Sequence, residues 1–213
     1  MRTDELIGLL SAHLEPVDSR KLARSIGLAI GVGSVLSLAL ILFAFGVRPD
    51  LANPNAQLFV AIKLAFTVGI VAAATACVSK LARPGADASA RIALIALPFF
   101  AMLAAAILKL TGVPTPDWAG MMLRGEWLDC LISIPAIAVI PFATIVFAVR
   151  AAAPTDLKRT GAVVGLVAGA ISATAYALHC TSDSLPFITL WYGGTIGLCA
   201  VAGTVLGPSL LRW

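Results

Sequence analysis

The sequence predicts an all-α, polytopic membrane protein: a six-transmembrane-helix bundle with a short cytoplasmic N-terminal amphipathic helix. Three observations predict this class. Hydrophobic residues make up 60% of the 213 residues and charged residues only 12%, against about 25% charged in a typical soluble domain. The mean hydropathy is +0.97. Long apolar stretches also alternate with short charged or turn-forming segments, a pattern that excludes disordered chains, coiled coils and ordinary soluble enzymes.

Six stretches are long enough to cross a bilayer, whose hydrocarbon core of about 30 Å needs roughly 20 apolar residues in a helix. Each stretch is bounded by charges or by Pro, Gly or Asn. Prolines inside the third and fourth stretches do not exclude a helix, since neighbouring helices can cover the freed carbonyls. The predicted spans are Ile26–Val47, Leu58–Ser79, Arg91–Thr111, Cys130–Val149, Gly161–His179 and Phe187–Leu211.

The distribution of Lys and Arg predicts the orientation of the chain. Eleven of these residues fall on the side that holds both termini, and four fall on the other side. Because cytoplasmic loops carry the excess of positive charge, we expect both termini to face the cytoplasm from a bacterial inner (cytoplasmic) membrane. Lys63 and Lys109 lie near outer helix ends, where we expect them to snorkel toward the headgroups.

The first 25 residues form a separate cytoplasmic segment, and residues 26–213 form the transmembrane domain. Leu6, Ile7, Leu10 and Leu14 recur at helical spacing, so one face of a short helix is apolar. Such a helix either lies on the membrane surface or docks into a groove on a partner protein.

Small residues at intervals of four predict close packing between helices. Gly161, Gly165 and Gly169 form the longest such series. Shorter pairs are Gly27 with Gly31, Gly193 with Gly197, and Gly203 with Gly207. The pattern fits a compact bundle and a possible homodimer.

The sequence offers no candidate for catalysis and little for transport. The centres of the six spans contain no acidic residue, whereas pumps and carriers usually bury one. No Ser/His/Asp arrangement, phosphate-binding loop or H-E-x-x-H motif is present. The net charge is only +4, and the basic residues form no long tract. Both observations argue against direct nucleic-acid binding. We therefore expect a protein that is not an enzyme and has no resident cofactor.

Two of the four cysteines fall at the predicted outer rim. Cys130 opens the fourth span, and Cys180 closes the fifth. Three states remain open for this pair: a disulfide, transient capture of a heavy-metal ion with His179 or Asp183 as auxiliary ligands, or two unpaired residues with no role. Cys77 and Cys199 lie inside spans and are expected to be small apolar residues.

Aromatic residues near the predicted span ends are interpreted as membrane-interface anchors, because amphipathic rings prefer that depth. They are Trp118, Trp127, Trp191, Tyr192 and Trp213.

Several motifs together resemble a known family. They are Leu178-His179-Cys180-Thr181-Ser182-Asp183-Ser184, then Phe187 and Trp191-Tyr192, the ending Leu206-Gly207-Pro208-Ser209-Leu210-Leu211-Arg212-Trp213, the opening Thr3-Asp4-Glu5-Leu6-Ile7 with Leu14, Pro16 and Val17, and Trp127-x-x-Cys130 with Ile134-Pro135 and Pro141. The chain resembles the NrsF family of six-span anti-sigma factors over nearly its whole length.

The resemblance implies a regulator that holds an extracytoplasmic-function sigma factor inactive. It implies that the sigma-binding residues are Leu6, Ile7, Leu10 and Leu14. It also implies that Cys130 and Cys180 form a sensor pair, whose modification under heavy-metal or oxidative stress relieves the inhibition.

Two other functions stay open from the residues alone. One is a small membrane transporter or membrane redox protein that uses Cys130, His179 and Cys180. The other is a structural membrane subunit, suggested by the glycine series.

Overall fold

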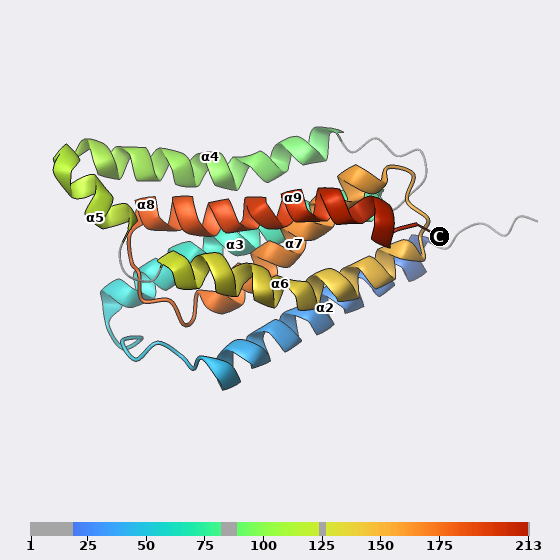
Figure 1. Cartoon of the computed structure of the whole chain (residues 1–213), viewed down its shortest axis with the longest axis horizontal. Helices are drawn as coiled ribbons and strands as arrows, with labels where there is room; N and C mark the ends of the chain where they lie inside the picture. The colour runs from blue at the N-terminus through green and yellow to red at the C-terminus, as the bar shows by residue number, and fades with distance from the viewer. Residues whose placement is uncertain (1–18, 82–88, 124–126, 213) are drawn as a thin grey trace, which may run out of the picture.

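The computed structural model describes residues 19–81, 89–123 and 127–212, and these are helical with no strand among them (Figure 1). The short helical segments are η1 (Thr115–Asp117), α5 (Trp118–Met122), α8 (Leu185–Phe187) and the π-helical turn η2 (Ile188–Tyr192). The long helices are α2 (Ser19–Ala44), α3 (Pro54–Leu81), α4 (Ser89–Thr111), α6 (Trp127–Arg150), α7 (Leu157–Tyr176) and α9 (Gly193–Leu210). The predicted all-α, membrane-type fold is therefore confirmed.

Five helical stretches are long and apolar enough to cross a membrane, namely Arg20–Ala44, Pro54–Leu81, Ala93–Thr111, Thr115–Arg150 and Leu185–Leu210. The sixth long helix, α7, has the length for a crossing, because 20 residues rise about 30 Å. It is less apolar because it begins with Lys158 and Arg159 and carries three glycines.

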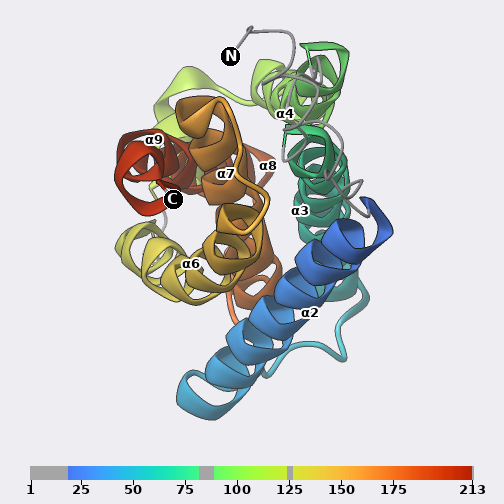
Figure 2. The ribbon, with the colours of Figure 1, turned by 90° about the vertical axis from the view of Figure 1, so that its right-hand side faces the viewer.

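Helix α7 lies at the centre of the bundle, between α3, α6 and α9 (Figure 2). Most of its residues are buried, so few of them need a side chain suited to lipid. The low hydropathy of α7 is therefore consistent with its central position, where its side chains contact protein rather than lipid. Helix α4 lies at the periphery, where it packs on α3 and on the short helix α8.

A glycine seam joins α7 to α9. A β-carbon placed on Gly161 would overlap the carbonyl of Gly203 and lie 2.8 Å from the Cα of Gly207. A β-carbon on Gly165 would overlap the carbonyl of Cys199. The backbones therefore approach too closely for any side chain, as the spacing of the glycines predicts.

The other glycine pairs behave differently. Gly27, Gly31 and Gly197 face open space, with no heavy atom within 4 Å of the position that a β-carbon would occupy, and Gly193 makes only ordinary contacts. The expected close packing at these pairs is therefore wrong within a single chain. A different glycine, Gly33, allows α2 to pack closely where it crosses α6. A β-carbon on Gly33 would lie 2.8 Å from the Cα of Pro141.

The two ends of the bundle differ in charge. The end that holds the start of α2 and the C-terminus of α9 also carries nine of the twelve Lys and Arg residues within the described ranges. The opposite end carries the other three, Arg48, Lys63 and Lys109. The helices alternate in direction, so the basic end is the one that the charge rule assigns to the cytoplasm.

Two helix boundaries near Cys180 differ from the predicted ones. The fifth span was expected to reach His179, but α7 ends at Tyr176. The next helical stretch begins at Leu185 rather than at Phe187. Residues 177–184, including His179 and Cys180, therefore form a connecting segment, which we call the Cys180 segment.

Candidate functional site

The thiols of Cys130 and Cys180 meet at the end of the bundle opposite the basic end. Cys130 lies in the first turn of α6, and Cys180 lies in the Cys180 segment. Both residues are fully buried, and the two thiols lie close enough to influence each other's ionisation. Both are free thiols in this structure. The sequence predicted that they could come close, and the helix ends bring them together.

Large aromatic and aliphatic side chains enclose the pair. Tyr176, Phe187, Ile188 and Tyr192 belong to the same buried cluster. Ile188 and Tyr192 are the first and last residues of the π-helical turn, a departure from α-helical geometry that often marks a functional site.

A cluster of buried charges holds the Cys180 segment from the other side. The Nη1 atom of Arg48 donates to the Cys180 carbonyl at 3.1 Å and to Asp183 Oδ1 at 3.0 Å. Its Nη2 atom donates to Asp183 Oδ2 at 2.7 Å. Lys63 Nζ donates to the same Cys180 carbonyl at 2.9 Å and to Asp183 Oδ1 at 3.2 Å. The side chains of both cations are completely buried, so two positive charges converge on one carbonyl and one carboxylate.

Asp50 completes the charge cluster. The Nε and Nη2 atoms of Arg48 donate to its two carboxylate oxygens at 2.6 and 2.7 Å. Arg48 is thus clamped between two carboxylates in the fork geometry that its guanidinium favours. This pairing stabilises a charge that would otherwise be costly to bury.

Backbone contacts add to the connection between the α2–α3 loop and the Cys180 segment. The Arg48 amide donates to the Leu178 carbonyl at 3.0 Å. His179 Nδ1 lies 3.1 Å from the Gly46 carbonyl. The α2–α3 loop and the Cys180 segment are therefore bonded at several points.

Interactions in the two loops favour the charged forms of Arg48, Asp50 and Cys180. Hydrogen bonds to Asp50 and Asp183 raise the pKa of Arg48, and the hydrogen bond from Arg48 lowers the pKa of Asp50. The hydrogen bond from Cys130, followed by the charge of Lys63, lowers the pKa of Cys180 against the opposing effect of burial. Of the two thiols, Cys180 therefore has the greater tendency to ionise.

Two expectations from the sequence are wrong here. Lys63 does not snorkel to the membrane surface, because its ammonium group finds partners inside the bundle. Tyr192 is not an interface anchor, because it is fully buried with its ring centroid 5.8 Å from Lys63 Nζ.

The proposed auxiliary metal ligands are engaged by other partners. Asp183 binds Arg48 and Lys63, and His179 contacts the Gly46 carbonyl. No group of three or more His, Cys, Asp or Glu suited to a metal ion occurs in the described ranges. A soft ion at the thiols would therefore be held by Cys130 and Cys180 unless the Asp183 ion pairs opened.

The other expected residues are distributed as follows. Trp127 and Trp191 are half-buried and stack with ring centroids 4.9 Å apart, and Trp191 Nε1 donates to the Met122 carbonyl at 2.7 Å. Trp118 is half-buried nearby and donates to the Val113 carbonyl. The expected sigma-binding residues Leu6, Ile7, Leu10 and Leu14, with the expected anchor Trp213, lie outside the described residues.

Arg48 and Lys63 were not predicted as parts of the site. A signal was available, since they are two of only four basic residues assigned to the outer side, and Asp50 and Asp183 fall in outer loops of the same predicted topology. Sequence alone did not show which charges would meet.

The fold and the site define a helical membrane-type protein with a buried thiol pair at one end. Comparison with known proteins assigns the family. The profile of the family described as NrsF, negative regulator of sigma F, matches residues 10–213. The chain belongs to this family of regulators.

Two curated relatives cover the whole length of both chains. The "Probable anti-sigma-F factor NrsF" of Azospira oryzae is 32% identical over 213 residues. The "Anti-sigma-F factor NrsF" of Caulobacter vibrioides is 33% identical over 219 residues. No solved structure matches the chain.

Proposed function

We propose that this protein sequesters an extracytoplasmic-function sigma factor with its N-terminal segment and releases it when heavy-metal or oxidative stress modifies Cys130 and Cys180. In this proposal the chain crosses the bacterial inner membrane several times, with both termini in the cytoplasm. One observation carries the proposal: the Cys180 segment is bonded to Arg48 in the loop that follows α2, and α2 begins directly after the N-terminal segment in the sequence.

The apolar stripe of Leu6, Ile7, Leu10 and Leu14 supports the binding half of the proposal. A short helix with such a stripe gains stability by burying it against a partner. The names of both relatives, which are anti-sigma-F factors, support a sigma factor as that partner.

The chemistry of the thiols supports the sensing half. A two-electron oxidant would take two electrons and two protons from the pair as the sulfur–sulfur bond forms. A soft divalent cation would instead displace both thiol protons and bind two thiolates, without change of oxidation state. Because both thiols are buried, the proposal favours small reagents such as metal ions and peroxides over bulky ones.

The charge cluster supplies a route from the thiols to α2. Movement of Cys180 would disturb its carbonyl, which accepts hydrogen bonds from Arg48 and Lys63. Arg48 would pass that movement to the outer end of α2. Shifting the bundle from 1% to 99% of the releasing state requires about 5.5 kcal/mol, which is of the same order as the stabilisation by a disulfide or by metal–thiolate bonds.

A pull-down from membranes tests the binding half. Leu6→Asp combined with Leu10→Asp should abolish capture of the sigma factor, because two charges would enter the apolar face. Gly8→Asp combined with Ala12→Asp adds the same charge on the opposite side of the predicted helix and should leave capture intact. Capture by the Leu6/Leu10 variant would refute the assigned site.

Reporter transcription under cadmium or peroxide stress tests the sensing half. Cys130→Ser with Cys180→Ser should repress normally and fail to respond, because the reacting sulfurs are gone. Cys77→Ser with Cys199→Ser is the matched control and should respond like the parent chain.

Arg48→Lys separates sensing from transmission in the same assay. Lysine keeps the charge but loses the two-pronged contacts, so the thiols should still react, as seen by mass spectrometry, while the sigma factor stays bound. A normal response in this variant would remove Arg48 from the route, and a normal response in the Cys130/Cys180 variant would remove the sensor.

A further inference from the structure

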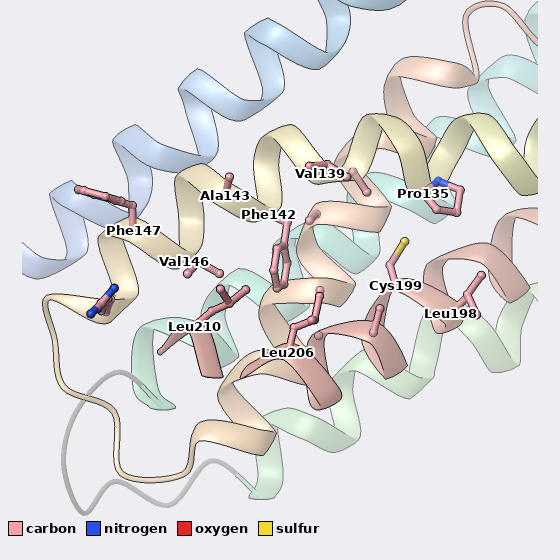
Figure 3. A pocket seen from close by; sticks show the side chains of 16 residues that line it. Pro135, Val139, Phe142, Ala143, Val146, Phe147, Leu198, Cys199, Leu206 and Leu210 are labelled. Atoms are coloured by element: carbon pink, nitrogen blue, oxygen red, sulfur yellow. The ribbon is translucent and has the colours of Figure 1, made fainter. Parts of the chain in front are cut away.

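An apolar groove lies on the flank of the bundle between α6 and α9 (Figure 3). Its cavity volume is about 580 Å³. Side chains of α6 and α9 form its two walls, and Gly165 and Ala168 of α7 contribute to its floor. The groove exists because α7 separates α6 from α9, and the small residues of the glycine seam leave its floor unfilled.

The groove has the length of one membrane leaflet. Along α6 it runs from Pro135 to Arg150, which corresponds to about 22 Å of helix. One leaflet, counted with its headgroup region, is about 20–22 Å thick, so the groove extends from the middle of the membrane to headgroup depth at the basic end.

The width of the groove selects a narrow occupant. Dividing 580 Å³ by about 22 Å gives an average cross-section of about 26 Å². A helix 10–12 Å in diameter has a cross-section of roughly 80–110 Å². A second copy of a transmembrane helix therefore does not fit inside, whereas a single hydrocarbon chain is narrow enough.

The charge at the basic end of the groove selects the headgroup. Arg150 is the one charged residue in a lining that is otherwise apolar or small. It is exposed and forms no ion pair with any residue of the described ranges. It lies at the end of the bundle with nine of the twelve described basic residues. Basic pockets between helices on the cytoplasmic side are suited to anionic lipid headgroups.

We propose that the α6–α9 groove binds one acyl chain of an anionic glycerophospholipid, with the lipid phosphate at Arg150. This site is separate from the thiol pair and does not depend on the sensing proposal. A lipid held there would fill the space beside the α7–α9 seam and hold α6 and α9 at a fixed separation.

Native mass spectrometry of the full chain tests the proposal, with phosphatidylglycerol and phosphatidylcholine of equal chain length as the probes. Phosphatidylglycerol should bind more tightly. Arg150→Gln should weaken its binding about fivefold and leave phosphatidylcholine binding unchanged. Arg24→Gln removes a charge from the same end on α2 and is the matched control.

A second variant tests the groove itself. Ala143 and Ala202 line it and are exposed, so Ala143→Trp with Ala202→Trp should fill it without disturbing the core and should abolish retention of both lipids. Val205→Trp places the same ring on α9 outside the groove and should have no effect.

Photo-crosslinking of the unmodified chain gives a readout that does not depend on a variant folding. A phosphatidylglycerol with a diazirine in its acyl chain should label α6 and α9 between residues 135–150 and 198–210. Equal affinity for the two lipids, lipid retention by the filled variant, or labelling confined to α2 and α4 would overturn the proposal. Loss of a dimer in the filled variant without loss of lipid would assign the groove to a second copy instead.

Discussion

Arg48 joins two loops at the end of the bundle opposite the basic end. Its side chain is completely buried, and it holds Asp50, Asp183 and the Cys180 carbonyl at once. Removing one partner of a buried ion pair leaves the other charge uncompensated, and that cost exceeds the gain from the pair itself.

Arg48→Met should therefore lower the free energy of unfolding by about 3 kcal/mol, at the lower end of the range for buried pairs because Asp183 is partly exposed. Thermal unfolding of the purified chain in detergent measures this loss. Arg159→Met is the matched control, because Arg159 pairs with Asp156 on the surface. It should change stability by less than about 1 kcal/mol, and equal losses in the two variants would contradict the assigned role of Arg48.

At this scale the sequence predicted part of the site. The positions of Cys130 and Cys180 at neighbouring span ends indicated that the thiols could meet. The burial of Lys63 and Tyr192 was not predicted, because hydropathy places a residue along the membrane normal but does not show whether it faces lipid or protein. The side of the helix on which Lys63 lies is set by partners such as Asp183. That residue lies 120 residues further along the chain than Lys63.

Helix α7 shows how packing can replace hydropathy in a membrane protein. Its glycines contact the backbone of α9 directly, so its stability comes from close contact with protein rather than from apolar side chains in lipid. The sequence predicted both the span and the contact face, since its glycines recur at intervals of four. It did not show which glycine pairs find partners, because that depends on which faces the other helices present.

Gly161→Ala should destabilise the bundle by about 1–3 kcal/mol, because the added methyl group overlaps the facing backbone of α9. Gly27→Ala makes the same change at an open position and should be neutral or slightly stabilising, because alanine favours the helix. Unfolding temperatures of the two variants in the same detergent measure the difference. A tolerated Gly161→Ala would mean that α7 and α9 lie further apart than described.

At the scale of the whole molecule, the charge asymmetry predicts the orientation. Cysteines introduced as Asn55→Cys and Thr155→Cys occupy exposed positions at opposite ends of the bundle, in a chain whose own four cysteines are serine. An impermeant maleimide should label Asn55→Cys in spheroplasts and Thr155→Cys only after the membrane is opened. The reverse pattern would place the thiol pair and the N-terminal segment on the sides opposite to those proposed.

The central position of α7 has a consequence for how the protein is made. The chain is synthesised from its N-terminus, so α7 emerges while α9, the partner of its glycine face, does not yet exist. A helix of limited hydropathy gains little from lipid alone. The stable insertion of α7 therefore depends on the final stretch from Leu185 onward, which supplies the partner of its glycine face.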